Sequence, residues 1–304
     1  NTALTKRYIF ERRFTNARRP CQRMYVFQYA ADLSRYTSMA PHTSVGFVPT
    51  MGALHAGHLA LIRRAVAAGD LATASIFVNP TQFNDPEDLR KYPRTPEADV
   101  SILAKAGCHA VLMPSVEEVY PAGGQSYEFS FGHLETVMEG AFRPGHFKGV
   151  AQVVARLLDM VRPQRLYMGQ KDFQQTAIVA EMLRQLNSST QLIVAETVRE
   201  TDGLAMSSRN VRLSPEFRAA APVIYQCLLD AKRLYPEMDA AAITARAMQK
   251  MESAGLRPEY FEIVDGRTLL PVGNPRQADF VVACTAAWAG DVRLIDNVVL
   301  RAAG

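Results

Sequence analysis

The sequence lacks any run of eighteen apolar residues, so it predicts no membrane-spanning helix. It also lacks a Cys-x-x-Cys pair, because its four cysteines are widely spaced: Cys21, Cys108, Cys227 and Cys284. We therefore expect reduced, mostly buried thiols in a cytoplasmic protein, and no disulfide framework. No internal repeat or low-complexity tract is present. The 304 residues and 48% apolar content are enough for two domains, each with a core.

Net positive charge is confined to the N-terminal end. The net charge is +4, but residues 1–23 alone carry +6, which leaves −2 on residues 24–304. A body of that charge does not predict a nucleic-acid surface. The Arg-rich, nearly acid-free stretch 1–23 resembles an organellar transit peptide. Two alternatives are a flexible tail and a segment that precedes a true start at Met24. We favour these two over a transit peptide.

Strand and helix patterns alternate between residues 45 and 198. Short apolar runs predict strands at 45–48, 74–78, 110–113, 165–168 and 191–198. Helical spacing predicts helices at 58–68, 96–106, 149–161 and 172–186. This alternation predicts a Rossmann-like α/β fold, a doubly wound parallel sheet with helices on both faces. Ligands bind such sheets at the carboxyl ends of the strands.

Beyond Arg209 the pattern changes. Ser214 and Pro215 predict the start of a helix that continues to about Leu234. A second helix at 240–254 and strands at 260–264, 280–283 and 292–295 follow. We therefore expect three segments: a flexible basic tail (1–23), a nucleotide-binding domain (24–198) and a smaller C-terminal α+β domain that acts as a lid (199–304).

The segment between the first strand and the first helix is the most informative: Pro49-Thr50-Met51-Gly52-Ala53-Leu54-His55-Ala56-Gly57-His58. A helix N-terminus offers unpaired N–H groups and a positive dipole end, which suit a phosphate. His55 and His58 lie one helical turn apart and can donate to that phosphate near neutral pH. The alternative is a structural histidine pair. A metal site has no third ligand nearby in the sequence.

Further polar residues follow the other predicted strands. Lys171 can offer a charge to phosphate, and Asp172 can cap a helix or hold a sugar hydroxyl or a metal. Lys171 can equally be a solvated lysine. Gln174 and Gln175 can bind a hydroxyl or a carboxylate without adding charge. Asn79 and Gln82, in the loop after the second of these strands, suit a small polyhydroxy acid.

Two loops mix small and charged residues. Ser207, Ser208 and Arg209, within the loop 205–210, can close on a triphosphate, or they form an ordinary interdomain connector. Within the loop 139–147, Arg143 can contact an anion and His146 can orient a neighbouring side chain. The alternative is that both residues only stabilise the loop. The charged stretch 85–91 predicts a solvated helix face.

Taken together, these residues resemble the pantoate–β-alanine ligase family. The matching stretches occur in the family's order and span residues 24 to 300: 49–58, 79–83, 91–94, 139–147, 169–175, 202–210 and 287–297. Gln170 departs from the pattern, because many members of the family have Glu there. This change matters little if position 170 acts through its backbone.

The resemblance implies an adenylate-forming ligase of the HIGH-type nucleotidyltransferase superfamily. It would join (R)-pantoate to β-alanine with Mg²⁺-ATP through a pantoyl adenylate, as a homodimer, with no nucleic-acid or membrane partner. Magnesium would be held mainly through ATP rather than by the protein. The resemblance implies these ATP contacts: Met51, Gly52, Ala53, Leu54, His55, Ala56, Gly57, His58, Gly169, Gln170, Lys171, Asp172, Val198, Met206, Ser207, Ser208 and Arg209.

The resemblance also implies individual roles. His58 matches the family's general acid, and the other expected catalytic residues are His55, Lys171, Ser207, Ser208 and Arg209. Gln82 would contact pantoate and β-alanine, and Gln175 would contact pantoate. We add Asn79 and Arg143 as expected substrate contacts.

The sequence leaves two alternative functions open. A nucleotidyltransferase that moves AMP or CMP onto a phosphorylated small molecule would share the 51–58 segment but gives no reason for Asn79, Gln82 and Gln175. A tRNA-binding protein derived from a synthetase predicts a basic face, against which the net charge of −2 on residues 24–304 argues.

Overall fold

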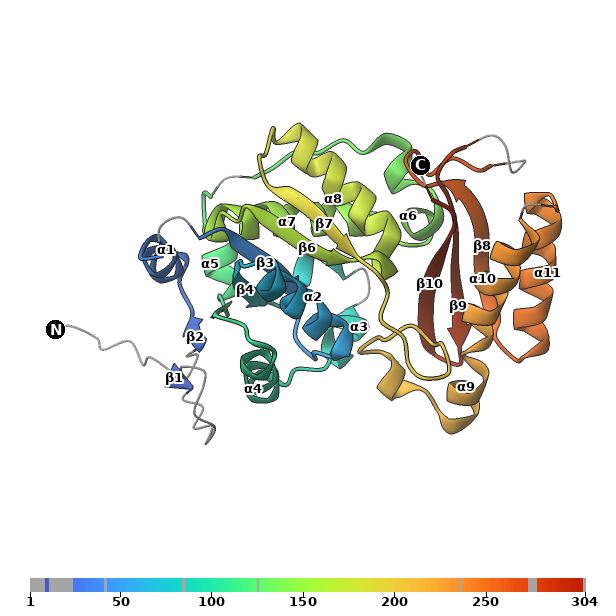
Figure 1. Ribbon diagram of the computed structural model, residues 1–304, viewed down its shortest axis with the longest axis horizontal. Coiled ribbons are helices and arrows are strands. Elements are labelled where there is room, and N and C mark those ends of the chain that lie inside the picture. Colours follow the sequence, from blue (N-terminus) through green and yellow to red (C-terminus); the bar gives the residue numbers. More distant parts are fainter. Residues whose placement is uncertain are drawn as a thin grey trace. The chain divides into compact units, whose positions relative to one another are not determined.

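The computed structural model describes residues 9–10, 24–40, 43–83, 86–124, 126–235, 237–272 and 278–302. Packing divides the chain into two compact units. The first comprises residues 1–129, 148–168 and 179–195, and the second 130–147, 169–178 and 196–304. The residues 130–147 and 169–178 therefore pack with the C-terminal part of the chain. Figure 1 labels the elements of each unit. The lid role of the second unit stays a prediction.

The first unit contains a largely parallel sheet with the strand order β1-β2-β5-β4-β3-β6-β7. Its strands are β1 (Ile9–Phe10), β2 (Met24–Phe27), β3 (Val45–Thr50), β4 (Leu71–Ile76), β5 (Ala110–Leu112), β6 (Arg165–Gly169) and β7 (Gln191–Ala195). The pairs β2–β5, β5–β4, β4–β3 and β3–β6 are parallel, and β1 is antiparallel to β2. This sheet confirms the predicted α/β fold. The strand β2 was not predicted.

Helices cover this sheet because their apolar faces need burial. The main ones are α1 (Ala30–Ser38), α2 (Ala56–Ala67), α4 (Pro96–Ala106), α7 (His146–Val161) and α8 (Phe173–Gln185), with the short α3 (Pro86–Lys91) and α5 (Val116–Val119). Ile62 of α2 and Leu103 of α4 pack with Val48 and Val111 of the strands in one buried cluster. The bounds of α4 are those predicted, since Pro96 occupies its first turn and Gly107, at φ 91°, ends it.

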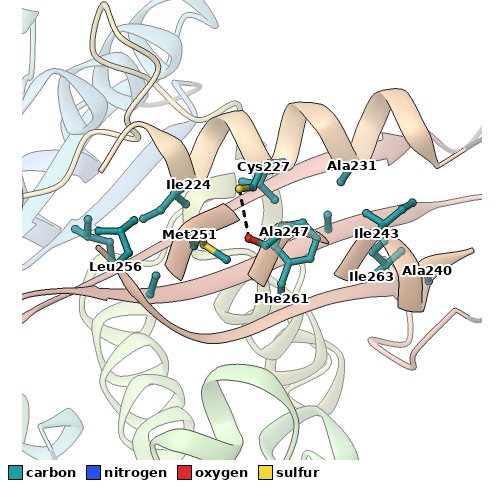
Figure 2. Packing of buried hydrophobic residues seen from close by; sticks show 14 of the residues in the cluster. Ile224, Cys227, Ala231, Ala240, Ile243, Ala247, Met251, Leu256, Phe261 and Ile263 are labelled. Carbon is teal, nitrogen blue, oxygen red and sulfur yellow. Dashed lines mark hydrogen bonds between the residues drawn. The ribbon is translucent and has the colours of Figure 1, made fainter. Parts of the chain in front are cut away.

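The second unit contains an antiparallel sheet of three strands in the order β10-β9-β8. These are β8 (Arg257–Asp265), β9 (Val281–Ala289) and β10 (Val292–Arg301), and all three are longer than predicted. The helices α10 (Val223–Leu234) and α11 (Ala240–Ser253) pack on the sheet, as Figure 2 shows for Ile224, Met251 and Phe261. The short α6 (Met138–Phe142) also belongs to this unit.

The prediction of one helix from Pro215 to Leu234 is wrong. The structure has α9 (Pro215–Ala220) and α10, which begins after Pro222. Proline has no N–H to donate to the carbonyl four residues earlier, so the helical hydrogen-bond ladder is interrupted there. The predicted strand to residue 198 is also too long, because β7 ends at Ala195.

Three of the four cysteines lie among the described residues, and all three are buried free thiols. Burial raises the pKa of Cys227 to about 11 and that of Cys108 to about 12. The predicted flexible tail lies outside the described residues, except for β1 at Ile9–Phe10. None of the helices among the described residues is long and apolar enough to cross a bilayer.

Candidate functional site

The turn after β3 brings the two histidines together at the start of α2. Gly52, at φ 82°, and Ala53, at φ 49°, reverse the chain in the left-handed region. His55 is the N-cap of α2, and its Nδ1 accepts the Gly57 N–H at 3.2 Å. The Nδ1 of His58 accepts the His55 N–H at 3.3 Å, and the two ring centroids are 4.1 Å apart.

These hydrogen bonds determine where each histidine carries its proton. Because Nδ1 of both His55 and His58 accepts a backbone N–H, the proton of each neutral ring lies on Nε2. Each imidazole can therefore donate from Nε2. This arrangement suits proton donation to a phosphate, and it results from the same contacts that cap the helix.

The prediction that this turn offers unpaired N–H groups is wrong for most of them. Asp99 of α4 accepts the N–H of Ala53 at 3.0 Å and that of Leu54 at 2.8 Å. The N–H of Gly52 bonds Thr50 Oγ1 at 3.2 Å. With the histidine contacts, the N–H groups of residues 52–55 and 57 all have acceptors within the protein. The imidazoles, rather than these N–H groups, are what the turn can offer an anion.

Asp99 itself was missed from the sequence. It is 2% exposed and also accepts from Thr95 Oγ1 at 3.2 Å. Its position on the buried face of α4, with Leu103 and Ala106 at helical spacing, was the available signal. A carboxylate on the apolar face of a helix needs partners, and here the turn supplies them.

Asn79 and Gln82 also lie in the first unit, at the 3₁₀ turn Pro80–Gln82. Asn79 is 1% exposed and donates to Gln82 Oε1 at 3.1 Å and to the carbonyl of Gly149 at 3.2 Å. Its Oδ1 accepts from Tyr120 and from Thr81. A direct hydrogen bond from Asn79 to a substrate would therefore break a protein contact.

Gln82 is connected to the histidine turn, since its Nε2 lies 3.0 Å from the Met51 sulfur. Gly149 of α7 allows this packing, because a Cβ there would lie 2.5 Å from the carbonyl oxygen of Thr81 and 2.9 Å from Gln82 Cα. The structure thus brings together Met51, His55, His58 and Gln82 within the first unit.

The second unit has a pocket of its own that gathers other predicted residues. Arg143, His146, Lys171, Asp172 and Gln175 all line it. The remaining lining residues are Met138, Glu139, Phe147, Phe173, Gln174, Tyr260, Cys284, Ile295, Asp296 and Asn297. That the pocket and the histidine turn form one site stays a prediction.

The two adjacent glutamines in this pocket differ. Gln174 is 4% exposed, accepts from Glu139 N at 3.0 Å and donates to the carbonyls of Leu134 and Val137 at 2.7 and 2.8 Å. Among the described residues, no side chain or backbone group is paired with the amide of Gln175. Gln174 therefore supports the loop, and Gln175 is the amide that can bind a ligand.

Charge in the pocket is balanced by buried pairs. Arg293 forms hydrogen bonds of 2.7 Å to both oxygens of Glu139, and Tyr260 donates to Glu139 at 2.9 Å. Burial opposes ionisation of Glu139, but Arg293 and then Tyr260 hold its pKa below the usual value. Arg143 donates to His146 Nε2 at 3.1 Å, so the proton of the neutral His146 ring lies on Nδ1.

Lys171 lies in a short 3₁₀ turn, Gln170–Asp172, that follows β6. Its Nζ is 3.6 Å from Asp172 Oδ1, and the two side chains are 19% and 47% exposed. Asn297 of β10 donates to the carbonyls of Gln170 and Lys171, both at 2.9 Å. Asn297 lies in the stretch 287–297 that resembles the family, and these contacts show that it supports the Lys171 turn.

The predicted mobile loop begins at a small hairpin. Arg199 and Ala205 form an antiparallel bridge, and Met206 N donates to the carbonyl of Val198 at 3.0 Å. Ser207 Oγ accepts the Arg209 N–H at 3.2 Å. The predicted ATP contacts Val198 and Met206 are thus neighbours, and the turn at 207–209 is closed locally.

Comparisons with known proteins agree with this fold. The family model for pantoate-beta-alanine ligase matches residues 25–299. The pantothenate synthetase of Porphyromonas gingivalis is 49% identical over 278 residues, covering 90% of this chain and 99% of that protein. That of Bacteroides fragilis is 49% identical over 279 residues, covering 90% and 98%.

Solved structures give the same result. The pantothenate synthetase of Thermus thermophilus superimposes with a TM-score of 0.85 at 42% identity, covering 91% of this chain and 99% of that one. The pantoate-beta-alanine ligase of Francisella tularensis, complexed with β,γ-ATP and β-alanine, gives 0.77 at 33% identity, covering 91% and 98%. The parallel sheet and its strand-to-helix turns define a Rossmann-like α/β protein. More specifically, the chain belongs to the pantoate–β-alanine ligase family.

Proposed function

We propose that this chain joins pantoate to β-alanine at the expense of ATP, giving pantothenate, AMP and pyrophosphate. The observation that carries this proposal is the family match over residues 25–299, which includes every turn described above. In the first half-reaction a carboxylate oxygen of pantoate attacks the α-phosphorus of ATP, and pyrophosphate leaves with the electron pair. In the second, the β-alanine nitrogen attacks the acyl carbon, loses a proton, and AMP leaves.

The roles of the residues follow from their chemistry. His58 and His55, each with a proton on Nε2, suit donation to the phosphates. We assign charge stabilisation to Lys171, together with Ser207, Ser208 and Arg209. The Met51–His58 turn, the Gly169–Asp172 turn, Val198 and Met206 complete the proposed ATP contacts.

The substrate contacts divide into direct and supporting groups. We propose Gln82 as the contact shared by pantoate and β-alanine, and Gln175 as a second contact to pantoate. The pocket position of Arg143 suits an anionic group. Asn79 remains a candidate substrate contact. Its amide already donates hydrogen bonds to Gln82 and to the Gly149 carbonyl, which favours a role in holding Gln82 in place.

ATP is expected to bring magnesium with it. Asp172 offers one partly exposed carboxylate beside Lys171, and Mg²⁺ is commonly held by one or two carboxylates together with substrate phosphates. In the part of the chain that the structure describes, no group of three or more His, Cys, Asp or Glu side chains could hold a metal ion. The single carboxylate of Asp172 suits a metal that is held mainly through the phosphates of ATP and neutralises them. We further propose a homodimer, on the family resemblance, and a cytoplasmic location, with which the buried free thiols agree.

Pyrophosphate exchange tests the proposal. The protein is incubated with ATP and labelled pyrophosphate, together with pantoate, with β-alanine, or with neither. We expect label to enter ATP only when pantoate is present, because adenylate formation needs the carboxylate alone. Exchange without pantoate, or none at all, would overturn the assignment.

A further inference from the structure

Two adjacent polar residues are buried in the middle of strand β10. Asp296 is 4% exposed and Asn297 is 2% exposed. Burying such groups is unfavourable unless they are hydrogen-bonded. Their hydrogen-bond partners therefore indicate which structural role the two residues have. The partners of Asn297 lie in the Gln170–Asp172 turn, which the proposed function assigns to ATP binding. Arg199, the partner of Asp296, lies between the proposed ATP contacts Val198 and Met206. All of these residues belong to the second unit.

Asn297 holds the turn that carries Lys171. Its Nδ2 donates to the carbonyls of Gln170 and Lys171, both at 2.9 Å, and its Oδ1 accepts from Gln170 Nε2 at 3.1 Å. Only an amide side chain can donate twice and accept once in this way. A carboxylate of the same size would face the two carbonyl oxygens with like partial charge.

Asp296 holds the hairpin that leads into the 206–209 loop. Its two oxygens accept from Arg199 at 2.6 and 3.0 Å, and Arg199 Nη1 also donates to the carbonyl of Gly203 at 3.1 Å. The guanidinium lies 3.7 Å from the centre of the Tyr225 ring. Arg199 pairs with Ala205, which directly precedes residues 206–209. A bidentate, stacked arginine of this kind is rigid.

We propose that Asn297 and Asp296 are positioning residues that fix the Lys171 turn and the base of the 206–209 loop on one strand before ATP binds. This inference rests on the proposed function for its catalytic consequence. Preorganised charges stabilise a transition state without reorganising at the moment of reaction.

The first test needs no substrate. Amide hydrogen exchange of the full-length protein is measured for Asn297→Asp, Asp296→Asn and a control, Thr285→Val. Thr285 is fully buried on the neighbouring strand β9 and loses one hydrogen bond of 2.7 Å in the control. We expect Asn297→Asp to speed exchange in peptides spanning 169–173, and Asp296→Asn in peptides spanning 199–210. The control should change neither segment. Equal changes in all three variants would show general loosening and overturn the proposal.

The second test measures the catalytic consequence in pyrophosphate exchange. We expect Asn297→Asp to lower kcat/KM for ATP by about tenfold or more, with the KM for pantoate within about threefold of the parent value. In a Lys171→Ala background the same change should cost less than about threefold, because its effect passes through Lys171. Full additivity of the two substitutions, or a kcat/KM equal to that of the Thr285→Val control, would contradict positioning. If the parent protein shows no exchange, the proposed function fails, while the hydrogen-exchange result still decides the positioning of the two segments.

Discussion

Two turns that follow strands carry the predicted phosphate contacts, and different backbone groups hold them in place. In the turn before α2, backbone N–H groups donate to the buried carboxylate of Asp99. In the turn after β6, backbone carbonyls accept from the buried amide of Asn297. Each turn thus depends on one polar side chain from a distant part of its own unit.

This difference determines what each turn can offer a nucleotide. In the first turn, most backbone N–H groups donate hydrogen bonds within the protein. We therefore expect this turn to contact an anion through the Nε2–H groups of His55 and His58. In the second, two backbone carbonyls accept hydrogen bonds from Asn297, and the side chain of Lys171 is the cationic group of the turn. A strand-to-helix turn is often treated as a backbone anion site. In this chain we expect its side chains to carry that role.

The largest effect is expected at the first turn. His58→Ala should lower pantoate-dependent pyrophosphate exchange by about 10²–10⁴-fold with folding retained, as for loss of a general acid or charge stabiliser. His58→Gln is the matched variant, because its carbonyl oxygen can still accept the His55 N–H. We expect the glutamine variant to be equally inactive. If glutamine restores exchange, helix capping rather than proton donation explains the residue.

Asp99→Asn tests what holds the first turn. An amide presents N–H groups where Asp99 now accepts from Ala53 and Leu54, so at least one donor loses its acceptor. The free energy of unfolding should fall by about 1–3 kcal/mol, and the rate of pantoate-dependent pyrophosphate exchange should fall as well. Urea denaturation measures the first and the exchange assay the second. A variant as stable as the parent would mean that the carboxylate does not hold the turn.

Gln174 and Gln175 sharpen the comparison within the second unit. Gln174→Ala removes three hydrogen bonds of a buried side chain and should cost about 2–4 kcal/mol of stability. Gln175→Ala should stay within about 0.5 kcal/mol of the parent but raise the KM for pantoate, because it removes no side-chain hydrogen bond to the described residues. Thermal unfolding and steady-state kinetics separate the two. The opposite pattern would reverse the assignment of these glutamines.

The smallest effect is expected at position 170, where the resemblance implies Glu in many members of the family. Gln170→Glu would place a carboxylate beside Asn297 Oδ1, which now accepts from Gln170 Nε2 at 3.1 Å. The backbone contact from Asn297 remains, so we expect the KM for ATP to rise only about two- to fivefold. An unchanged KM would show that position 170 acts through its carbonyl alone.

The sequence predicted what local patterns determine. The bounds of α4 follow from Pro96 and Gly107, and alternating strand and helix patterns correctly predicted the parallel sheet. It could not predict the contacts that hold the turns, because Asp99 is 46 residues from Ala53 and Asn297 is 126 from Lys171. The helix break at Pro222 was the avoidable error, since proline removes a donor wherever it stands.

The most direct test of the account follows oxygen from pantoate. Pantoate labelled with ¹⁸O in both carboxylate oxygens is turned over with ATP, Mg²⁺ and β-alanine, and the products are analysed by mass spectrometry. Attack of the carboxylate on the α-phosphorus predicts one labelled oxygen in AMP and one in pantothenate. Unlabelled AMP, or label in inorganic phosphate with release of ADP, would contradict adenylate formation by this protein.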